Sequence, residues 1–240
     1  MRIAEIFRSI QGEGRLTGTE SIFVRASGCN LRCRYCDTPY ASWMPEGEDL
    51  SVDEILARVE QFDRLSADAA RPAQSVRHVV LTGGEPMLFA ELIPLSAALR
   101  RQGRHITIET AGTLYLPVEC DLMSISPKLS NSSPAPDRDP RWTWRHERNR
   151  LAPEVLRLLL SQYDYQLKFV VDRPEDCLEV ESFLAEFPEI DRARAMLMPQ
   201  GTDAADLAEK ALWLEPYCAA HQLAFCPRRH IEWFGQTRGR

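Results

Sequence analysis

The sequence of 240 residues lacks any uninterrupted run of the roughly twenty apolar residues that a membrane-spanning helix needs. Its first residues, MRIAEIFRSIQGEG, also lack the apolar segment behind a basic start that marks a secretion signal. Positive charge is not in excess, because 29 lysines and arginines stand against 35 aspartates and glutamates, for a formal net charge of -6. A general basic field that would hold nucleic acid is therefore excluded. We expect a cytoplasmic protein with neither a membrane nor a nucleic acid as its partner.

The seven cysteines lack the even number and regular spread of a disulfide framework. Three of them, Cys29, Cys33 and Cys36, lie within eight positions. Thiolates are soft ligands for zinc and for iron–sulfur clusters, so this grouping indicates a metal site in a reducing compartment. The other four are interpreted as core or surface thiols: Cys120, Cys177, Cys218 and Cys226.

Short runs rich in β-branched residues alternate with helical patterns along the chain. Helices are predicted from Ser51, where S-V-D-E forms a capping box, over about 88–101, from D-R-P-E at Asp172, and after Thr202. The repeated alternation predicts an α/β fold, a partial (incomplete) TIM-like barrel with mostly parallel strands. We expect one domain over residues 1–240, with an irregular loop over 129–152 and a C-terminal tail, 227–240, near the site. The predicted strands are 2–7, 21–26, 77–81, 105–109, 121–125, 166–171, 195–198 and 223–225.

Four motifs follow predicted strands directly. G-C-N-L-R-C-R-Y-C-D-T follows 21–26, T-G-G-E-P follows 77–81, E-T-A-G-T closes 105–109 and S-P-K-L-S-N-S closes 121–125. Active sites of parallel α/β folds lie at the C-terminal ends of the strands. We therefore expect these motifs to meet in one place.

The spacing CxxxCxxC allows three thiolates of one short loop to reach three different irons of a cubane cluster. The fourth iron would then keep an open position for an exogenous ligand, as a reactive cluster requires. A structural zinc site normally has four protein ligands, and no histidine or second CxxC lies nearby in the sequence to complete one. We therefore favour a 4Fe–4S cluster held by Cys29, Cys33 and Cys36 over zinc.

The cysteine spacing, with the aromatic Tyr35 before the last cysteine, resembles that of the radical S-adenosylmethionine superfamily. T-G-G-E-P resembles the superfamily's glycine-rich strand end, which holds the methionine part of the cofactor. Glycines let the backbone approach a ligand, and Glu85 can accept from an ammonium group. Seven segments in order resemble the 7-carboxy-7-deazaguanine synthase family: I-F-R-S-I-Q-G-E-G, F-V-R-A-S-G-C, C-D-T, T-G-G-E-P, E-T-A-G-T, S-P-K-L-S-N-S and L-K-F-V-V.

This resemblance implies a radical S-adenosylmethionine core that converts 6-carboxy-5,6,7,8-tetrahydropterin to 7-carboxy-7-deazaguanine with loss of ammonia, in 7-deazapurine (queuosine) biosynthesis. It implies a 4Fe–4S cluster, S-adenosyl-L-methionine and Mg²⁺ as cofactors, an electron donor such as flavodoxin, and a homodimer. No residue beyond the cluster and the cofactor need be catalytic. The implied substrate contacts are Ile10, Gln11, Gly12, Arg25 and Thr82, the implied cofactor contacts are Tyr35, Cys36, Asp37, Gly84, Glu85, Ser126, Pro127 and Lys128, and the implied Mg²⁺ ligand is Thr38.

Several positions keep two interpretations. Arg25 lies in an apolar strand and needs an anion, which a substrate carboxylate or an internal acidic residue would supply. Glu109 and Gln200 are further site candidates that could equally cap strand ends. Two departures from the family pattern are Ala111, where many members carry asparagine, and the tail, where His230, Gln236 and Arg238 are candidate lid residues.

Two rival functions share some of these features. A glycyl-radical-enzyme activase has the same cysteine spacing, but I-Q-G-E-G and S-P-K-L-S-N-S speak against it. A non-catalytic iron–sulfur or zinc protein that binds RNA would use a basic stretch interleaved with aromatic residues. With the whole chain acidic, we favour a solvated loop or a dimer contact for that stretch, which contains Arg138, Arg141, Trp142, Trp144, Arg145, His146, Arg148 and Arg150.

Overall fold

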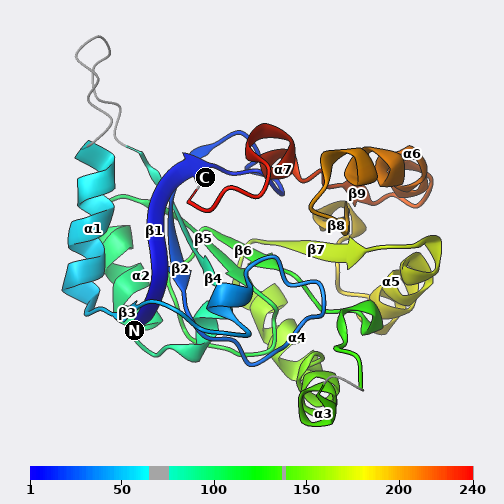
Figure 1. Cartoon of the computed structure of the whole chain (residues 1–240), viewed down its shortest axis with the longest axis horizontal. Coiled ribbons are helices and arrows are strands. Elements are labelled where there is room, and N and C mark those ends of the chain that lie inside the picture. Colours follow the sequence, from blue (N-terminus) through cyan, green and yellow to red (C-terminus); the bar gives the residue numbers. More distant parts are fainter. Residues whose placement is uncertain (65–75, 137–138, 240) are drawn as a thin grey trace.

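A nine-stranded, mostly parallel sheet organises the part of the chain that the computed structural model describes, residues 1–64, 76–136 and 139–239 (Figure 1). The strand order is β3-β1-β2-β4-β5-β6-β7-β8-β9. β1 pairs antiparallel with β2 and with β3, and all pairings from β2 to β9 are parallel. The strands are β1 (Arg2–Ile10), β2 (Glu20–Ala26), β3 (Glu48–Asp49), β4 (His78–Gly83), β5 (His105–Thr110), β6 (Leu122–Ile125), β7 (Tyr165–Val171), β8 (Ala195–Pro199) and β9 (Ala224–Phe225).

The sheet is open, because β3 and β9 end the strand order without pairing to each other. The predicted α/β fold, a mostly parallel and incomplete TIM-like barrel, is confirmed, and each predicted strand corresponds to an observed one. β1 and β2 are antiparallel because residues 11–19 are too few to form the crossover that parallel neighbours need.

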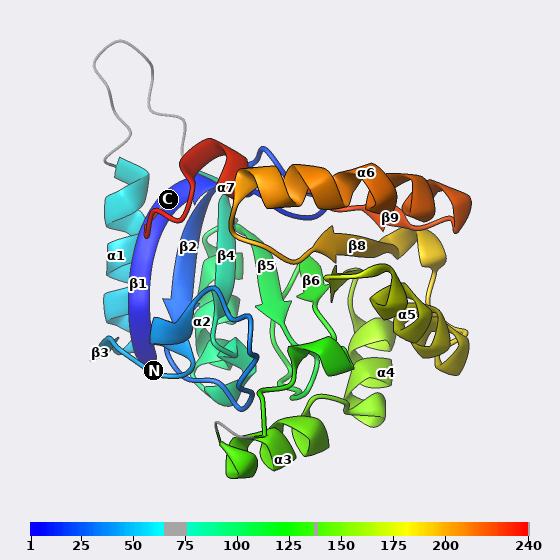
Figure 2. The same ribbon diagram turned by 45° about the vertical axis from the view of Figure 1, so that its right-hand side comes forward.

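Helices cover the outer face of the sheet, where their apolar stripes complete the core. α1 and α2 lie behind β1, β2 and β4, and α5 and α6 lie beside β7 and β8 (Figure 2). The predicted capping box at the start of α1 is present: Ser51 N donates to Glu54 at 2.8 Å, and Glu54 N donates to Ser51 Oγ at 3.3 Å. No helix in the described ranges is long and apolar enough to span a bilayer. The helices are α1 (Val52–Arg64), α2 (Leu92–Arg101), α3 (Pro140–Asn149), α4 (Pro153–Gln162), α5 (Pro174–Glu186), α6 (Ala204–Ala220) and α7 (Arg229–Phe234).

The prediction of an irregular loop over 129–152 is wrong, because α3 occupies much of that stretch. The start signals were in the sequence: Asp139 caps the helix by accepting from the amides of Arg141 and Trp142 at 3.1 and 3.2 Å, and Pro140 lies in the first turn. Arg138 lies outside the described residues. The predicted helix over 88–101 also begins later, at Leu92, and Leu88 is exposed in a preceding 3₁₀ turn.

Strand register aligns polar residues in a row across the sheet. Glu5 lies opposite Arg25, and Arg25 lies beside Thr82. Further along the sheet, Glu109 lies beside Ser124, which lies beside Gln166. Because side chains alternate between the two faces of a strand, residues aligned by this register lie on the same side of the sheet.

Candidate functional site

The predicted motifs meet at a cavity of about 760 Å³ at the C-terminal ends of the parallel strands. Most of the predicted site residues line it, and those that do are Ile10, Gln11, Gly12, Arg25, Cys29, Cys33, Tyr35, Cys36, Asp37, Thr38, Thr82, Gly84, Ser126 and Lys128. Glu109 and Gln200 line it as well. Of the predicted contacts, Glu85 and Pro127 do not.

The loop that carries the three cysteines is fastened to its surroundings by backbone hydrogen bonds. Gly28 N donates to Ala41 O at 2.8 Å, and the Trp43 indole donates to Cys33 O at 3.0 Å. Burial raises the pKa of the Cys29 thiol to about 12 and that of Cys33 to about 11. A bound metal would replace these protons, because the thiolate is the form that ligates.

The donor set fits an iron–sulfur cluster. All three thiols face one cavity from one loop, as ligands to different irons of the same cluster require. No three histidine, cysteine, aspartate or glutamate side chains of the described ranges converge as ligands of a single metal ion. The cysteine loop therefore does not form a compact mononuclear site.

The glycine-rich end of β4 lets two backbone segments touch. Gly83 has a φ of +144°, and a Cβ at Gly84 would lie 2.2 Å from Gly28 O. Only glycine fits there. Glu85 N donates to Gly28 O at 2.8 Å, so the strand end and the cysteine loop hold each other in place.

Glu85 serves this junction and is not exposed to the cavity. Its carboxylate is completely buried and accepts from Thr110 Oγ1 and Ala111 N, both at 2.8 Å, and from Met87 N at 3.1 Å. Burial raises its pKa. The predicted contact between Glu85 and a ligand ammonium therefore gains no support, and its visible task is to join β4 to the end of β5. The same bond satisfies the backbone amide of Ala111.

Arg25 has an internal acidic partner, as one of its two interpretations expects. Its Nε donates to Glu5 Oε1 at 2.7 Å, so an internal acid does pair with it, and the residue also lines the cavity. Tyr40 donates to the same Glu5 oxygen at 2.8 Å. Although burial opposes its ionisation, Tyr40 and Arg25 lower the pKa of Glu5. Arg25 is thus held in place while part of its guanidinium faces the cavity.

A buried lysine lies at the centre of the cavity wall. Lys168 donates to Glu13 Oε2 at 2.9 Å and to Glu109 Oε1 at 3.1 Å, and Thr82 donates to the other oxygen of Glu109 at 2.8 Å. Burial lowers the pKa of Lys168, but Glu109 and Glu13 outweigh it and raise the pKa above its usual range. The signal for this network in the sequence is a lysine inside a strand, Y-Q-L-K-F-V-V, that is otherwise suited to burial.

The same network reaches the C-terminal segment through Arg228. This arginine pairs with Glu13 at 3.3 Å and with Asp37, and it donates to Gly201 O at 2.5 Å. Burial raises the pKa of Glu13, yet Lys168 and Arg228 together hold that pKa well below its usual range. Glu13, which also fits a simple turn role by sequence, is therefore an ionised acceptor on the cavity wall.

The tail lies against the cavity. Arg229 N donates to Gly12 O at 2.9 Å. A Cβ at Gly12 would lie 2.5 Å from His230 N, so the close approach of the tail requires glycine at this position. Arg238 pairs with Glu5 at 3.2 Å and stacks 3.9 Å from the centroid of the Tyr40 ring. The three candidate lid residues, His230, Gln236 and Arg238, all line the cavity.

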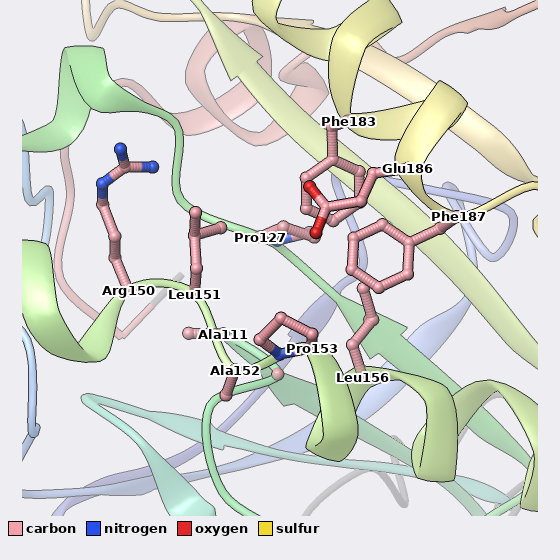
Figure 3. A pocket seen from close by; sticks show the side chains of 11 residues that line it. Ala111, Pro127, Arg150, Leu151, Ala152, Pro153, Leu156, Phe183, Glu186 and Phe187 are labelled. Carbon is pink, nitrogen blue, oxygen red and sulfur yellow. The ribbon is translucent and has the colours of Figure 1, made fainter.

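The end of β6 supplies the opposite wall. Lys128 donates to Ser126 Oγ at 2.7 Å, and Tyr35 donates to Asn131 at 3.2 Å. Pro127 instead lines a separate pocket of about 20 Å³ together with Leu151 and Phe183 (Figure 3). This second pocket is too small for a cofactor, so Pro127 shapes the backbone between Ser126 and Lys128.

Comparison with known proteins agrees with this geometry. Residues 23–126, which contain the cysteine loop and the end of β4, match the model of the radical SAM superfamily. The 7-carboxy-7-deazaguanine synthase of Rhodopirellula baltica is 42% identical over 238 residues, which cover 99% of this chain and 88% of that protein. This chain belongs to the 7-carboxy-7-deazaguanine synthase family. The synthase of Halobacterium salinarum is also 42% identical, over 95% of this chain and 88% of that protein.

Solved structures share the fold of this 7-carboxy-7-deazaguanine synthase family member. The crystal structure of QueE from Escherichia coli superposes with a TM-score of 0.66 at 24% identity, over 95% of this chain and 94% of that one. Streptococcus suis SuiB bound to S-adenosylmethionine gives a TM-score of 0.53 at 15% identity, over 84% of this chain and 48% of that one. The family prediction from the motifs is confirmed, and it displaces the activase and the non-catalytic RNA-binding alternatives.

A histidine of the basic stretch supports the cysteine loop of this synthase family member, a role that its sequence context does not indicate. His146 on α3 is completely buried; its Nδ1 accepts from Arg32 N at 3.1 Å, and its Nε2 lies 2.9 Å from Ser132 Oγ. Ser132 donates in turn to Leu129 O at 2.6 Å. Since Nδ1 accepts, the ring is neutral with its proton on Nε2. Burial lowers the pKa of His146 to about 4.

The lowered pKa of His146 predicts that the stability of the fold depends on pH. Because its pKa is about 4 in the folded chain and 6.5 ordinarily, the unfolded chain takes the proton first as the pH falls. The stability it contributes is complete above about pH 6.5 and is lost toward pH 4, with a loss of about 2 kcal/mol by pH 5. Urea unfolding of the metal-free protein at pH 7 and pH 5 should show this loss, and His146→Asn, which keeps an acceptor for Arg32 N, should lack it. An equal loss in both proteins would contradict the assignment.

Proposed function

We propose that this protein converts 6-carboxy-5,6,7,8-tetrahydropterin to 7-carboxy-7-deazaguanine with loss of ammonia, as a radical S-adenosylmethionine enzyme of 7-deazapurine (queuosine) biosynthesis. The observation that carries the proposal is that the three cysteines and the Lys168 network face the same cavity. When bound, a 4Fe–4S cluster and S-adenosylmethionine would supply the radical chemistry of this reaction. Cys29, Cys33 and Cys36 would hold the cluster.

The chain's own residues bind and orient the two organic molecules. Gly84, Ser126 and Lys128 line the part of the cavity nearest the cysteine loop and the end of β6, which suits the cofactor. The portion of the Arg25 guanidinium that Glu5 leaves open suits the substrate carboxylate, since this pairing is geometrically matched. A pterin also carries ring N–H donors.

The Lys168 network would accept these N–H groups. Glu13 remains ionised beside Lys168, and Glu109 is held by the same ammonium group, so the oxygens of both side chains are acceptors whose positions are fixed before the substrate arrives. The tail that contacts Gly12 and Glu5 closes one side of the cavity and would keep water away from a reactive radical.

The test of this function is turnover by the purified protein. After anaerobic reconstitution with iron and sulfide, addition of dithionite, S-adenosylmethionine and 6-carboxy-5,6,7,8-tetrahydropterin should produce the pyrrole absorbance of 7-carboxy-7-deazaguanine and an equal amount of ammonia. Omitting S-adenosylmethionine should abolish both. A protein with full iron content that forms neither product would refute the proposal.

We also propose that Mg²⁺ binds at Thr38. The Thr38 hydroxyl lines the cavity and lies 3.8 Å from Cys36 Sγ, and a hydroxyl oxygen is a hard donor that suits Mg²⁺. The remaining ligands would be water and the substrate carboxylate.

Removing the Thr38 hydroxyl should therefore weaken the binding of Mg²⁺. In Thr38→Val, we expect the Mg²⁺ concentration for half-maximal rate to rise by at least about tenfold while the iron content is unchanged. Thr202→Val, which removes another hydroxyl-bearing residue that lines the cavity, is the matched control and should keep the wild-type Mg²⁺ titration. Identical titrations for all three proteins would place the metal elsewhere.

The partners we propose are an electron donor such as flavodoxin and a second copy of the chain, in the cytoplasm, where thiols stay reduced. Light scattering of the purified protein should give twice the mass of the chain. A monomeric mass under conditions of full activity would refute the homodimer.

A further inference from the structure

α3 carries a stripe of basic side chains, although the whole chain has a net charge of -6. Arg141, Arg145 and Arg148 are separated by four and three residues, so they share one face of the helix, and all three are exposed. Trp144 lies beside them with 61% of its surface exposed. Arginine and tryptophan are the residue types that concentrate at the centres of protein interfaces. We call these four residues the α3 stripe.

The α3 stripe is joined to the cysteine loop by stacked side chains. The Arg145 guanidinium lies 5.4 Å from the centroid of the Trp142 ring, and Arg32 lies 3.9 Å from the same ring. Arg32 donates to Cys29 O at 2.8 Å. A short line of contacts therefore runs from the exposed stripe to a cysteine that would hold the cluster.

α3 is fixed in this position. His146 accepts from Arg32 N, and Arg150, just after the helix, donates to Lys128 O at 3.0 Å. α3 projects at the lower margin of the molecule, below α4 (Figures 1 and 2), and contacts the loop after β2 through the bond between Arg32 and His146. The helix is thus a rigid, outward-facing support of the cysteine loop.

The two sides of the cysteine loop have different surroundings. One side faces the cavity, which the proposed function fills with cofactor and substrate. The other side is packed against α3 and its neighbour Ser132, whose carbonyl accepts from Arg34 N at 2.9 Å. An electron carrier that approaches from the α3 side therefore reaches the cysteine loop without entering the cavity.

We propose that the α3 stripe is the docking surface for an acidic one-electron carrier protein that reduces the cluster. This inference rests on the proposed function, which requires an external electron. The reduced carrier loses one electron and the cluster gains it, and no bond forms or breaks in the transfer. The charge of the stripe complements an acidic partner, while the acidic remainder of the chain repels that partner from other faces.

The stripe suits a small protein better than RNA. A nucleic acid binds along an extended basic track, whereas here three arginines lie on a single short helix of an acidic chain. The link to Arg32 and Cys29 would also have no use in RNA binding.

The test uses a strongly acidic flavodoxin and two matched variants. Arg141→Gln/Arg145→Gln/Arg148→Gln removes the charge of the stripe, and Arg77→Gln/Arg101→Gln/Arg157→Gln removes the same charge from exposed arginines elsewhere. Calorimetric titration at low salt should show that the stripe variant binds flavodoxin at least about tenfold more weakly than wild type, and the control variant within about twofold. With reduced flavodoxin as the donor, the KM for flavodoxin should rise similarly.

Dithionite separates this proposal from the proposed function. With dithionite, the stripe variant should turn over within about twofold of wild type, because a small reductant needs no docking surface. Wild-type protein that is inactive with dithionite would refute the function but leave the binding result standing. The docking proposal is overturned if the stripe variant binds flavodoxin as wild type does, if it instead loses binding to a single-stranded RNA probe, or if it changes from dimer to monomer.

Discussion

Replacing Cys33 with alanine should abolish both iron binding and product formation. This thiol lines the cavity, and the role of Cys33 in holding the loop is carried by its backbone carbonyl, which accepts from the Trp43 indole. The substitution therefore removes a ligand while leaving that anchor. We expect iron and sulfide contents of the reconstituted protein to fall from about four per chain to near zero, and turnover with dithionite to fall by more than about a thousandfold.

A cysteine outside the loop provides the matched control. Cys120 is half-buried, and its thiol lies 3.7 Å from Ile106 O, so it fills space near β5. Cys120→Ala should keep its full iron content and turn over within about twofold of wild type. If Cys33→Ala retained four irons and its activity, the cluster would have to be held by other residues, and the central assignment of this site would be lost.

The cysteine site could be predicted from the sequence because its information is local. Three ligands lie within one short loop, and the strand before it shows its identity through a run of β-branched residues. The sheet could be predicted for the same reason. Each strand and most helices show their own hydrophobic periodicity, and the alternation of strands with helices predicts parallel strands. Features that depend only on residues close together in the sequence can therefore be predicted without a structure.

Contacts between distant segments could not be predicted in this way. Lys168 pairs with Glu13, 155 positions away, and Arg228 pairs with the same glutamate, 215 positions away. Neither partner has a neighbour in sequence that indicates the pairing. For Glu85, a carboxylate beside two glycines suits a ligand by local chemistry, whereas in the fold its side chain accepts hydrogen bonds from Thr110 and Ala111.

α3 was missed because its composition conceals a helix. Its two tryptophans and four charged residues gave no apolar stripe of the usual kind, while Pro140 and the serines before it are typical of a loop. The one buried residue at its centre is His146, which is polar. Helices that bury a hydrogen-bonded polar group are therefore harder to predict from sequence than helices that bury leucine.

Replacing Lys168 with methionine should destabilise the protein strongly. The ammonium lies between Glu13 and Glu109 in a buried wall, so its removal leaves carboxylates without their cation. Breaking a buried pair in this way costs about 3–5 kcal/mol, because the uncompensated charge stays behind. Urea unfolding should show that loss, and the remaining folded protein should bind the pterin poorly because the carboxylates are no longer held in place.

Lys210→Met is the matched control for this prediction. Lys210 also pairs with two carboxylates, Asp172 at 2.8 Å and Asp206 at 3.0 Å, but its own side chain is 15% exposed to water, against 5% for Lys168. Since solvated ion pairs contribute little, its loss should cost only about 1 kcal/mol. The difference between the two lysines then measures the effect of burial rather than of losing a charge.

The pH dependence and a second substitution identify the cause. In the wild type, Lys168 and Arg228 hold the pKa of Glu13 below its ordinary value of 4.5, so the ionised Glu13 contributes stability that is complete above that value and is lost at lower pH. Without Lys168, Glu13 is protonated more readily, and the gap in unfolding free energy between wild type and Lys168→Met should narrow as the pH falls below about 4.5. The double variant Lys168→Met/Glu13→Gln should recover part of the loss at pH 7, because it removes a carboxylate that has lost its partner. A gap that stays constant with pH, together with no recovery in the double variant, would mean that Lys168 stabilises the fold through its packed methylene chain rather than through its charge.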